Sequence, residues 1–219
     1  MSTTIFPSYD GVVYKFVTDT WANTRNAHSG TLNVTSSYYI QNSHTSGRGG
    51  DTYQIGRYFL EFDTSSINKT ITDATLKIYG NTMGTLDVIL LKSSQTGAVL
   101  AGDFNEIANA AFPLVLSDGS GAGSFEPLSG IKKYSLEIDT WSTSGYNDIA
   151  LTDDAKADII ANDTFNCVLI GHGYDFRDIA PSEAWYRAQF YQDAFGGTSR
   201  DPYIEVEEQE NSVFFGCNF

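Results

Sequence analysis

The side chains best suited to contact a ligand are aromatic residues in two polar segments. Trp141 and Tyr146 lie in a segment rich in Ser and Thr, and Tyr174 and Phe176 lie in one that carries two Asp and an Arg. The apolar face of such a ring can stack on the C–H face of a sugar, while its polar rim stays in contact with water. We predict that these four residues bind a glycan or a protein; the alternative at each position is a core or loop-anchoring role.

Catalytic chemistry has no comparable signal in the chain. The sequence has no Gly-x-Ser-x-Gly nucleophile motif and no glycine-rich nucleotide loop. Because 27 of the 219 residues are Asp or Glu, the presence of any chosen carboxylate pair is uninformative. We predict that the protein is not an enzyme.

Metal binding is restricted to hard cations by the residue types present. The three histidines, His28, His44 and His172, are scattered and match no zinc motif. Calcium takes carboxylate and carbonyl oxygens, and Asp10 and Asp201 would approach each other if the first and last strands pair. We predict these two residues as ligands of a structural Ca²⁺; the alternative is a set of solvated loop acids.

The chain is strongly acidic, with a formal net charge of −14. A field of this sign repels nucleic acid and anionic membrane surfaces, so neither is an expected partner. Calcium, basic protein surfaces and neutral glycans are better tolerated, and solubility alone is the other explanation for the charge.

The cysteines and the N-terminus bear on the cellular compartment. Cys167 lies in an apolar run and Cys217 lies close to the C-terminus, so we expect two free thiols, with a disulfide as the alternative. Residues 1–7 have neither a basic nor an apolar region of the kind found in secretory signal peptides. No segment approaches the about 18 apolar residues of a membrane span.

Strand patterns position these residues. Aromatic residues make up 14% of the chain, a content that favours strands. In several short segments, apolar residues either alternate with polar ones or form a continuous run. We predict an all-β antiparallel β-sandwich (jelly roll) in which Trp21 and Trp185 are core residues, and in which Arg57 and Asp63 flank one strand as structural residues. The predicted strands are 58–63, 74–79, 86–91, 134–139, 165–170 and 202–207.

One short helix is expected over residues 153–162. Thr152 can cap its N-terminus, and two Asp in the first turn complement the helix dipole. Ala155 and Ile159 share one face and can cover one end of the sandwich.

The chain is predicted to form a single domain, residues 1–207, followed by an acidic and aromatic tail, residues 208–219. Three phenylalanines in this tail, Phe214, Phe215 and Phe219, are unusual for a free end. We predict that they form an assembly contact with a neighbouring subunit; docking onto their own domain is the alternative.

Five segments in the order found here, among them the loop Asn26 to Gly30, resemble the DNRLRE family of β-sandwich domains, which is similar to jelly-roll carbohydrate-binding modules. The most specific are Arg57 to Ile67, an apolar strand that ends in Phe-Asp, and Ala74 to Tyr79, Ala-Thr-Leu-Lys-Ile-Tyr. Residues 9–14 and 201–206 match the opening and closing strands of that family. The resemblance implies a β-sandwich of an extracellular, glycan-facing type.

The function predicted from these features is a non-catalytic binding or structural module. Because the resemblance implies an external location and no export signal is evident, we predict a phage virion surface component: a capsid decoration, head-fibre or tail-fibre protein that can bind a glycan or host surface. It would belong to an oligomer or larger assembly, on a virion surface or in the extracellular space. The alternative is a bacterial carbohydrate-binding module of a polysaccharide-degrading system.

Overall fold

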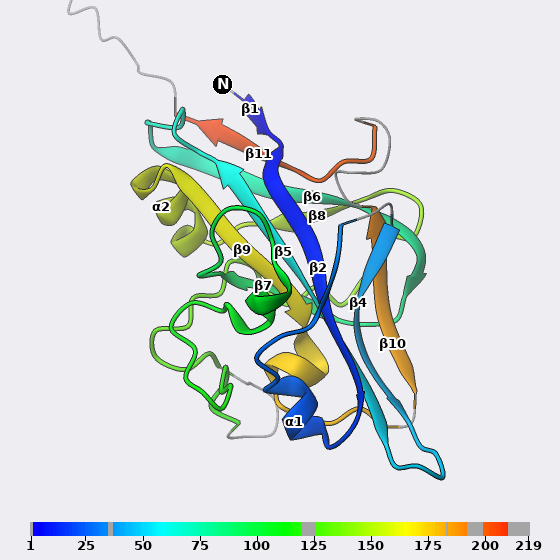
Figure 1. The fold of residues 1–219 in the computed structure, drawn as a ribbon. Helices are drawn as coiled ribbons and strands as arrows, with labels where there is room; N and C mark the ends of the chain where they lie inside the picture. Colours follow the sequence, from blue (N-terminus) through cyan, green and yellow to red (C-terminus); the bar gives the residue numbers. More distant parts are fainter. Residues whose placement is uncertain (1, 35–36, 120–125, 183, 192–198, 210–219) are drawn as a thin grey trace, which may run out of the picture.

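The computed structural model describes residues 2–34, 37–119, 126–182, 184–191 and 199–209 (Figure 1). These residues form an all-β antiparallel sandwich, which confirms the predicted fold class. The strands are β1 (Ser2–Ile5), β2 (Pro7–Thr18), β3 (Thr31–Asn33), β4 (Ser37–Thr45), β5 (Thr52–Asp63), β6 (Ile71–Gly84), β7 (Val88–Lys92), β8 (Tyr146–Ala150), β9 (Thr164–Gly171), β10 (Trp185–Tyr191) and β11 (Tyr203–Glu208). The helical elements are α1 (Trp21–Arg25), η1 (Ala101–Asn105), α2 (Asp153–Ala161) and η2 (His172–Phe176).

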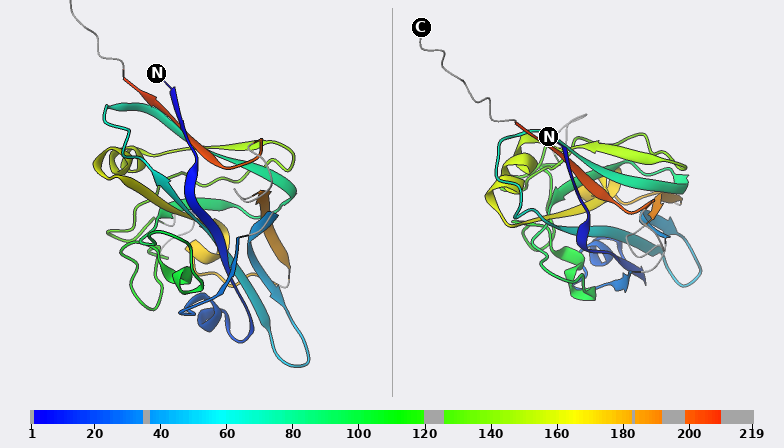
Figure 2. Two further views of the ribbon diagram at one scale, coloured as in Figure 1. Left: turned by 45° about the horizontal axis from the view of Figure 1, so that its top comes forward. Right: turned by 90° about the horizontal axis from the view of Figure 1, so that it is seen from above.

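Two sheets share the long strand β6. One sheet has the order β1–β11–β6–β8. The other has the order β10–β4–β5–β2–β3, and β9 and β7 continue it beside β5. β6 belongs to both, because residues 71–79 pair with β11 or β8 whereas residues 80–84 pair with β10. The two views of Figure 2 show the sheets as stacked layers.

The central strand β5 changes its neighbour on one edge at Arg57. Residues 52–56 pair with β4 and residues 58–63 pair with β9, while β2 runs along the whole of the other edge. The even-numbered side chains from 58 to 62 lie in the core between the sheets, and Phe59 lies in a second core on the opposite face. The strand is therefore buried on both faces, as its almost continuous apolar sequence requires.

Irregular segments cover the second core. Phe104 of η1, Phe176 of η2 and Trp21 of α1 pack there against β5, β7 and β9, together with Leu114 and Leu116 from the long connection between β7 and β8. Figure 1 shows this connection, in green, lying beside the sheet. The molecule thus has three layers: two sheets and an outer layer of loops and short helices.

Helix α2 confirms the prediction for residues 153–162. The hydroxyl of Thr152 accepts a hydrogen bond from the backbone N–H of Ala155 at the N-terminus of the helix. Ala155 and Ile159 are fully buried in the main core, so the helix covers one end of the sandwich. Helix α1 was not predicted. Trp21 is a core residue as expected, but it lies in this helix rather than in a strand.

The prediction of a strand over residues 134–139 is wrong. Lys133 and Ile138 form isolated bridges with Leu91 and Val88 of β7. Between them, the hydroxyl of Ser135 accepts the hydrogen bond from Leu90 N–H that a ladder carbonyl would otherwise take. Leu136, which the alternation placed in the core, is 76% exposed. Apolar and polar residues do alternate in the sequence here, but this segment does not pair with β7 in the continuous hydrogen-bonded ladder that defines a strand.

Cys167 lies in β9, is fully buried and has a free thiol, as predicted. Burial raises the pKa of this thiol. Cys217 and the predicted contact residues Phe214, Phe215 and Phe219 lie outside the described residues. In the part of the chain that the structure describes, no helix is long and apolar enough to span a bilayer.

Candidate functional site

Two of the four predicted ligand-binding aromatics are buried. Trp141 is 8% exposed, and its indole N–H donates to the carbonyl of Gln189 at 2.9 Å. Phe176 is 0% exposed in the second core. Neither ring is accessible to a ligand in this structure, and the structural alternative holds for both.

Tyr174 is half-buried in η2, the element that also contains Phe176. Its ring centroid lies 4.6 Å from that of Tyr186, and the side chain packs against both cores. Burial, and then the neighbouring hydroxyl of Tyr186, raise the pKa of Tyr174. Its position is that of a residue that anchors η2 to β10.

The loop at η2 contributes a buried ionic cluster instead of a binding surface. Asp175 is fully buried and accepts hydrogen bonds from Arg57 Nε at 2.7 Å and Arg57 Nη2 at 2.9 Å. Arg25 Nε lies 3.2 Å from the same carboxylate. Burial lowers the pKa of Arg25, and the carboxylate of Asp175 opposes that effect. Arg57 is structural, as predicted, but its partner is Asp175, not the exposed Asp63.

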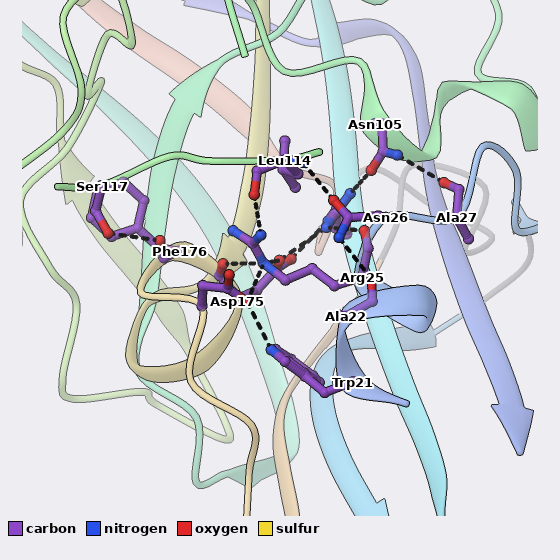
Figure 3. Close-up of polar contacts among 12 residues, drawn as sticks. Trp21, Ala22, Arg25, Asn26, Ala27, Asn105, Leu114, Ser117, Asp175 and Phe176 are labelled. Atoms are coloured by element: carbon purple, nitrogen blue, oxygen red, sulfur yellow. Dashed lines mark hydrogen bonds and ion pairs between the residues drawn. The ribbon is translucent and has the colours of Figure 1, made fainter. Parts of the chain in front are cut away.

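Backbone carbonyls complete this cluster. Arg25 donates to the carbonyls of Asp175 and Leu114, as Figure 3 shows, and Arg57 donates to those of Phe104 and Arg25. The guanidinium carbon of Arg57 lies 4.2 Å from the centroid of the Phe104 ring. The cluster joins β5 to the irregular outer layer, so we interpret it as structural.

The two predicted calcium ligands lie in different surroundings. β1 and β11 do pair, but the chain crosses to the other sheet after β1, and Asp10 of β2 pairs with Leu60 of β5. Its carboxylate accepts a hydrogen bond from the hydroxyl of Tyr58. Asp201 is buried just before β11. Among the described residues, no three Asp, Glu, His or Cys side chains gather as a metal site, and calcium stays a prediction.

A polar cavity of about 130 Å³ lies between α2 and β9. Lys92 and Lys132 form ion pairs with Asp158 at 3.0 Å and 2.9 Å, and the hydroxyl of Tyr134 donates to the same carboxylate at 2.5 Å. Because these groups satisfy one another, the cavity offers little charge to a ligand.

Half-buried and exposed aromatic residues gather on the outward face of β10 and its neighbours. Ala188 and Phe190 are buried in the main core, so the odd-numbered residues of β10 point outward. Ile78, Ile149 and Ile204 are likewise buried in β6, β8 and β11, and their neighbours in the alternation face out. We call the outward set the aromatic face: Tyr39, Tyr79, Tyr146, Trp185, Arg187, Gln189, Tyr191, Arg200 and Tyr203.

One end of the aromatic face is a three-membered stack. The guanidinium carbon of Arg187 lies 4.3 Å from the ring centroid of Tyr39 and 4.1 Å from that of Trp185. Trp185, predicted to be in the core, is 53% exposed because it lies on the outward face of β10. With Arg187 on one side of the indole, the exposed part of Trp185 is presented to solvent on a fixed support.

The other end is a row of tyrosines that crosses four strands. The ring centroids of Tyr203 and Tyr146 lie 5.3 Å apart, those of Tyr146 and Tyr79 5.1 Å, and those of Tyr79 and Tyr191 5.9 Å. All four side chains are half-buried. Arg200 lies over this row, with its guanidinium carbon 4.8 Å from the ring centroid of Tyr191.

Tyr146, the fourth predicted ligand-binding residue, lies in the middle of this row. Its hydroxyl donates to the carbonyls of Ser199 and Asp201, at 3.3 Å and 3.2 Å. Burial, and then the nearby Tyr203 and Asp201, raise the pKa of Tyr146. Tyr146 thus holds the segment that carries Arg200 against the face.

Amide side chains support the rings of the face: Gln41 is buried beneath them and Gln189 lies between them. The Nε of Arg187 donates to Gln41 at 3.0 Å, and Gln41 donates to Gln54 at 2.6 Å. Gln189, which pairs with Tyr39 across β10 and β4, accepts a hydrogen bond from Thr82 at 2.6 Å. The face therefore combines ring surfaces with fixed donors and acceptors.

Tyr146 is the residue of the aromatic face that the sequence analysis named as a ligand contact, and its role stays a prediction. Trp185, Arg187, Gln189 and Tyr191 are spaced two apart, a strand signal that was available in the sequence. What the sequence does not show is which side of that strand is outward, since both sides of β10 carry aromatic residues.

No protein-family model matches this chain, and no curated protein matches it. The resemblance to DNRLRE domains therefore stays a prediction.

Proposed function

We propose that this chain is a non-catalytic binding module whose aromatic face holds an extended glycan. The observation that supports the proposal best is the exposed Trp185, which stacks on Arg187, itself stacked on Tyr39. Gln189 and Tyr191 follow on the same face of β10. From residue 185 to residue 191 the strand covers about 20 Å, enough for several sugar rings in a line.

The chemistry of the face suits carbohydrate. Sugar rings present C–H faces that stack on aromatic rings, and hydroxyls that pair with amides and guanidinium groups. The aromatic face offers both kinds of group on neighbouring strands of the two sheets, which meet at β6.

The setting that we propose is the outside of a cell or of a virion. On a phage particle, such a face would bring the particle to host-surface glycans; in a polysaccharide-degrading system, it would hold an enzyme on its substrate. Imaging of the chain in its native assembly separates these two settings. Recovery with virion particles supports the first, and recovery with a secreted hydrolase supports the second.

A glycan array followed by titration calorimetry tests the proposal. We expect micromolar binding to at least one polysaccharide, weakened about fivefold or more in Trp185→Ala because stacking on one ring contributes about 1 kcal/mol or more. The matched control is Leu136→Ala, which removes an exposed apolar side chain outside the aromatic face. Equal affinity of Trp185→Ala and the wild type would contradict the proposal, as would the absence of binding to every glycan.

The non-catalytic part of the proposal has its own measurement. Incubation of the protein with each bound polysaccharide should release no new reducing ends. Turnover that persists in protein purified by two independent routes would show that the module is an enzyme.

A further inference from the structure

We infer that the ligand of the aromatic face is an acidic glycan whose carboxylate binds Arg187, an inference that rests on the proposed glycan-binding function. The net charge of −14 favours neutral partners on average. On the aromatic face, however, the positions of the two arginines favour an acidic ligand.

The guanidinium of Arg187 is fixed in orientation and has donors to spare. Tyr39 and Trp185 hold it from two sides, and its Nε is hydrogen-bonded to Gln41. Its two terminal nitrogens, Nη1 and Nη2, have no hydrogen-bond partner among the described residues and are not enclosed. A planar pair of N–H donors in this arrangement matches the two oxygens of a carboxylate.

Arg187 forms no ion pair with any residue that the structure describes. Seven other Lys and Arg side chains form ion pairs in the described structure: Arg25, Arg57, Lys77, Lys92, Lys132, Lys133 and Lys156. Acids outnumber bases 27 to 13, so an unpaired arginine on a strand is not explained by a shortage of carboxylates. Its charge is available to a ligand.

A second arginine lies further along the same face. Arg200 is exposed, lies over Tyr79 and Tyr191, and forms no ion pair with a described residue. Position 191 lies about 13 Å from position 187 along β10. A polymer that repeats a carboxylated sugar can therefore reach both guanidinium groups while its rings lie along the aromatic residues.

The overall negative charge does not prevent this contact at physiological salt. The screening length is then about 8 Å, so acids on distant parts of the surface act weakly on a group bound at Arg187. A charge-assisted, two-pronged hydrogen bond at close range is the stronger effect.

The test uses pairs of polymers that differ in the charged group. Calorimetry is carried out on polygalacturonate, alginate and hyaluronan, on the methyl-esterified form of each, and on dextran sulfate. We expect at least one carboxylated polymer to bind about tenfold or more tighter than its neutral ester. In Arg187→Gln most of this difference should be lost, because only Arg200 remains on the face, while the affinity for the neutral ester is retained.

Two further variants separate recognition from general charge. Arg48→Gln removes an exposed arginine in the turn between β4 and β5 and should leave the preference for the acidic form unchanged. Arg187→Lys keeps the charge but not the planar pair of donors, and should retain only part of the preference. Circular dichroism of each variant confirms that the fold is intact.

Each outcome bears on a distinct claim. Binding of neutral esters as tight as that of the acids, lost in Trp185→Ala, overturns the acidic-ligand inference and leaves the glycan-binding proposal standing. A preference for dextran sulfate alone overturns the assignment to a carboxylate. No binding to any polymer in the array or the panel removes both proposals.

Discussion

Arg57 and Asp175, separated by 118 residues in the chain, form a two-pronged ion pair in which neither side chain is exposed. The pair joins the central strand β5, at the point where its neighbour changes from β4 to β9, to the η2 loop that follows β9. The irregular outer layer is thus attached to the sandwich by buried charge as well as by apolar packing.

Removal of one partner should therefore destabilise the protein strongly. In Asp175→Ala, Arg57 and Arg25 lose their common carboxylate and remain buried, which costs about 3–5 kcal/mol. Urea unfolding measures this change. The control is Asp178→Ala, in the same loop. Its carboxylate is largely exposed, lies 3.6 Å from Arg25 and accepts a hydrogen bond from the indole N–H of Trp21 at 3.0 Å, so its removal should cost less, about 1–2 kcal/mol. Equal losses in the two variants would show that the buried pair has no special role.

Asp158 should make the stability depend on acid pH. Burial alone would raise the pKa of Asp158, but hydrogen bonds from Tyr134, Lys132 and Lys92 outweigh it, and the pKa lies below its ordinary value of 3.8. A carboxylate with a lowered pKa in the folded state stabilises the protein above the unfolded-state pKa, and this contribution is lost as the pH falls through the folded-state pKa.

We therefore expect Asp158→Asn to lose about 1–3 kcal/mol at pH 7 and to differ less from the wild type below pH of about 4. Urea unfolding at a series of pH values measures the difference. The same substitution at Asp153, an exposed residue of α2, should have a smaller effect on the pH dependence. A constant difference between Asp158→Asn and the wild type from pH 7 to the acid end would contradict the assignment.

Gly80 should tolerate no side chain. A Cβ at this position would lie 1.7 Å from the carbonyl oxygen of Ser142, in the loop that leads from Trp141 to Tyr146. Gly80→Ala should cost about 1–3 kcal/mol or more, because backbone must move. Gly102→Ala, where no atom lies within 4 Å of the added Cβ, is the matched control and should be nearly neutral. A neutral Gly80→Ala would show that this loop is free to shift.

Much of the sandwich follows from local patterns. Residues 74–79 and 165–170 alternate or run apolar as buried strands do, and Thr152 followed by two Asp marks the start of α2. These signals involve neighbours in the chain, so no knowledge of the pairing is needed to recognise them.

The candidate site depends on contacts that local patterns do not contain. Trp141 and Phe176 lie in polar segments and yet are buried, because β10 and the second core cover them. Trp185 is exposed because Ala188 and Phe190 take the inward side of β10. Which side faces inward depends on how β10 pairs with β4 and β6. Sequence reasoning found polar loops with aromatic rings; the structure places the accessible rings on a sheet.

The most direct test of the aromatic face uses its tryptophan. Trp21 and Trp141 are buried, so Trp185 is the tryptophan that an aqueous quencher reaches. Acrylamide quenching of the intrinsic fluorescence is measured with and without the polygalacturonate, alginate, hyaluronan or array glycan that calorimetry shows to bind. We predict that the bound glycan protects the wild type from quenching, and that Trp185→Phe is weakly quenched in both conditions. A glycan that binds while Trp185 stays fully open to acrylamide would place the binding site elsewhere on the molecule.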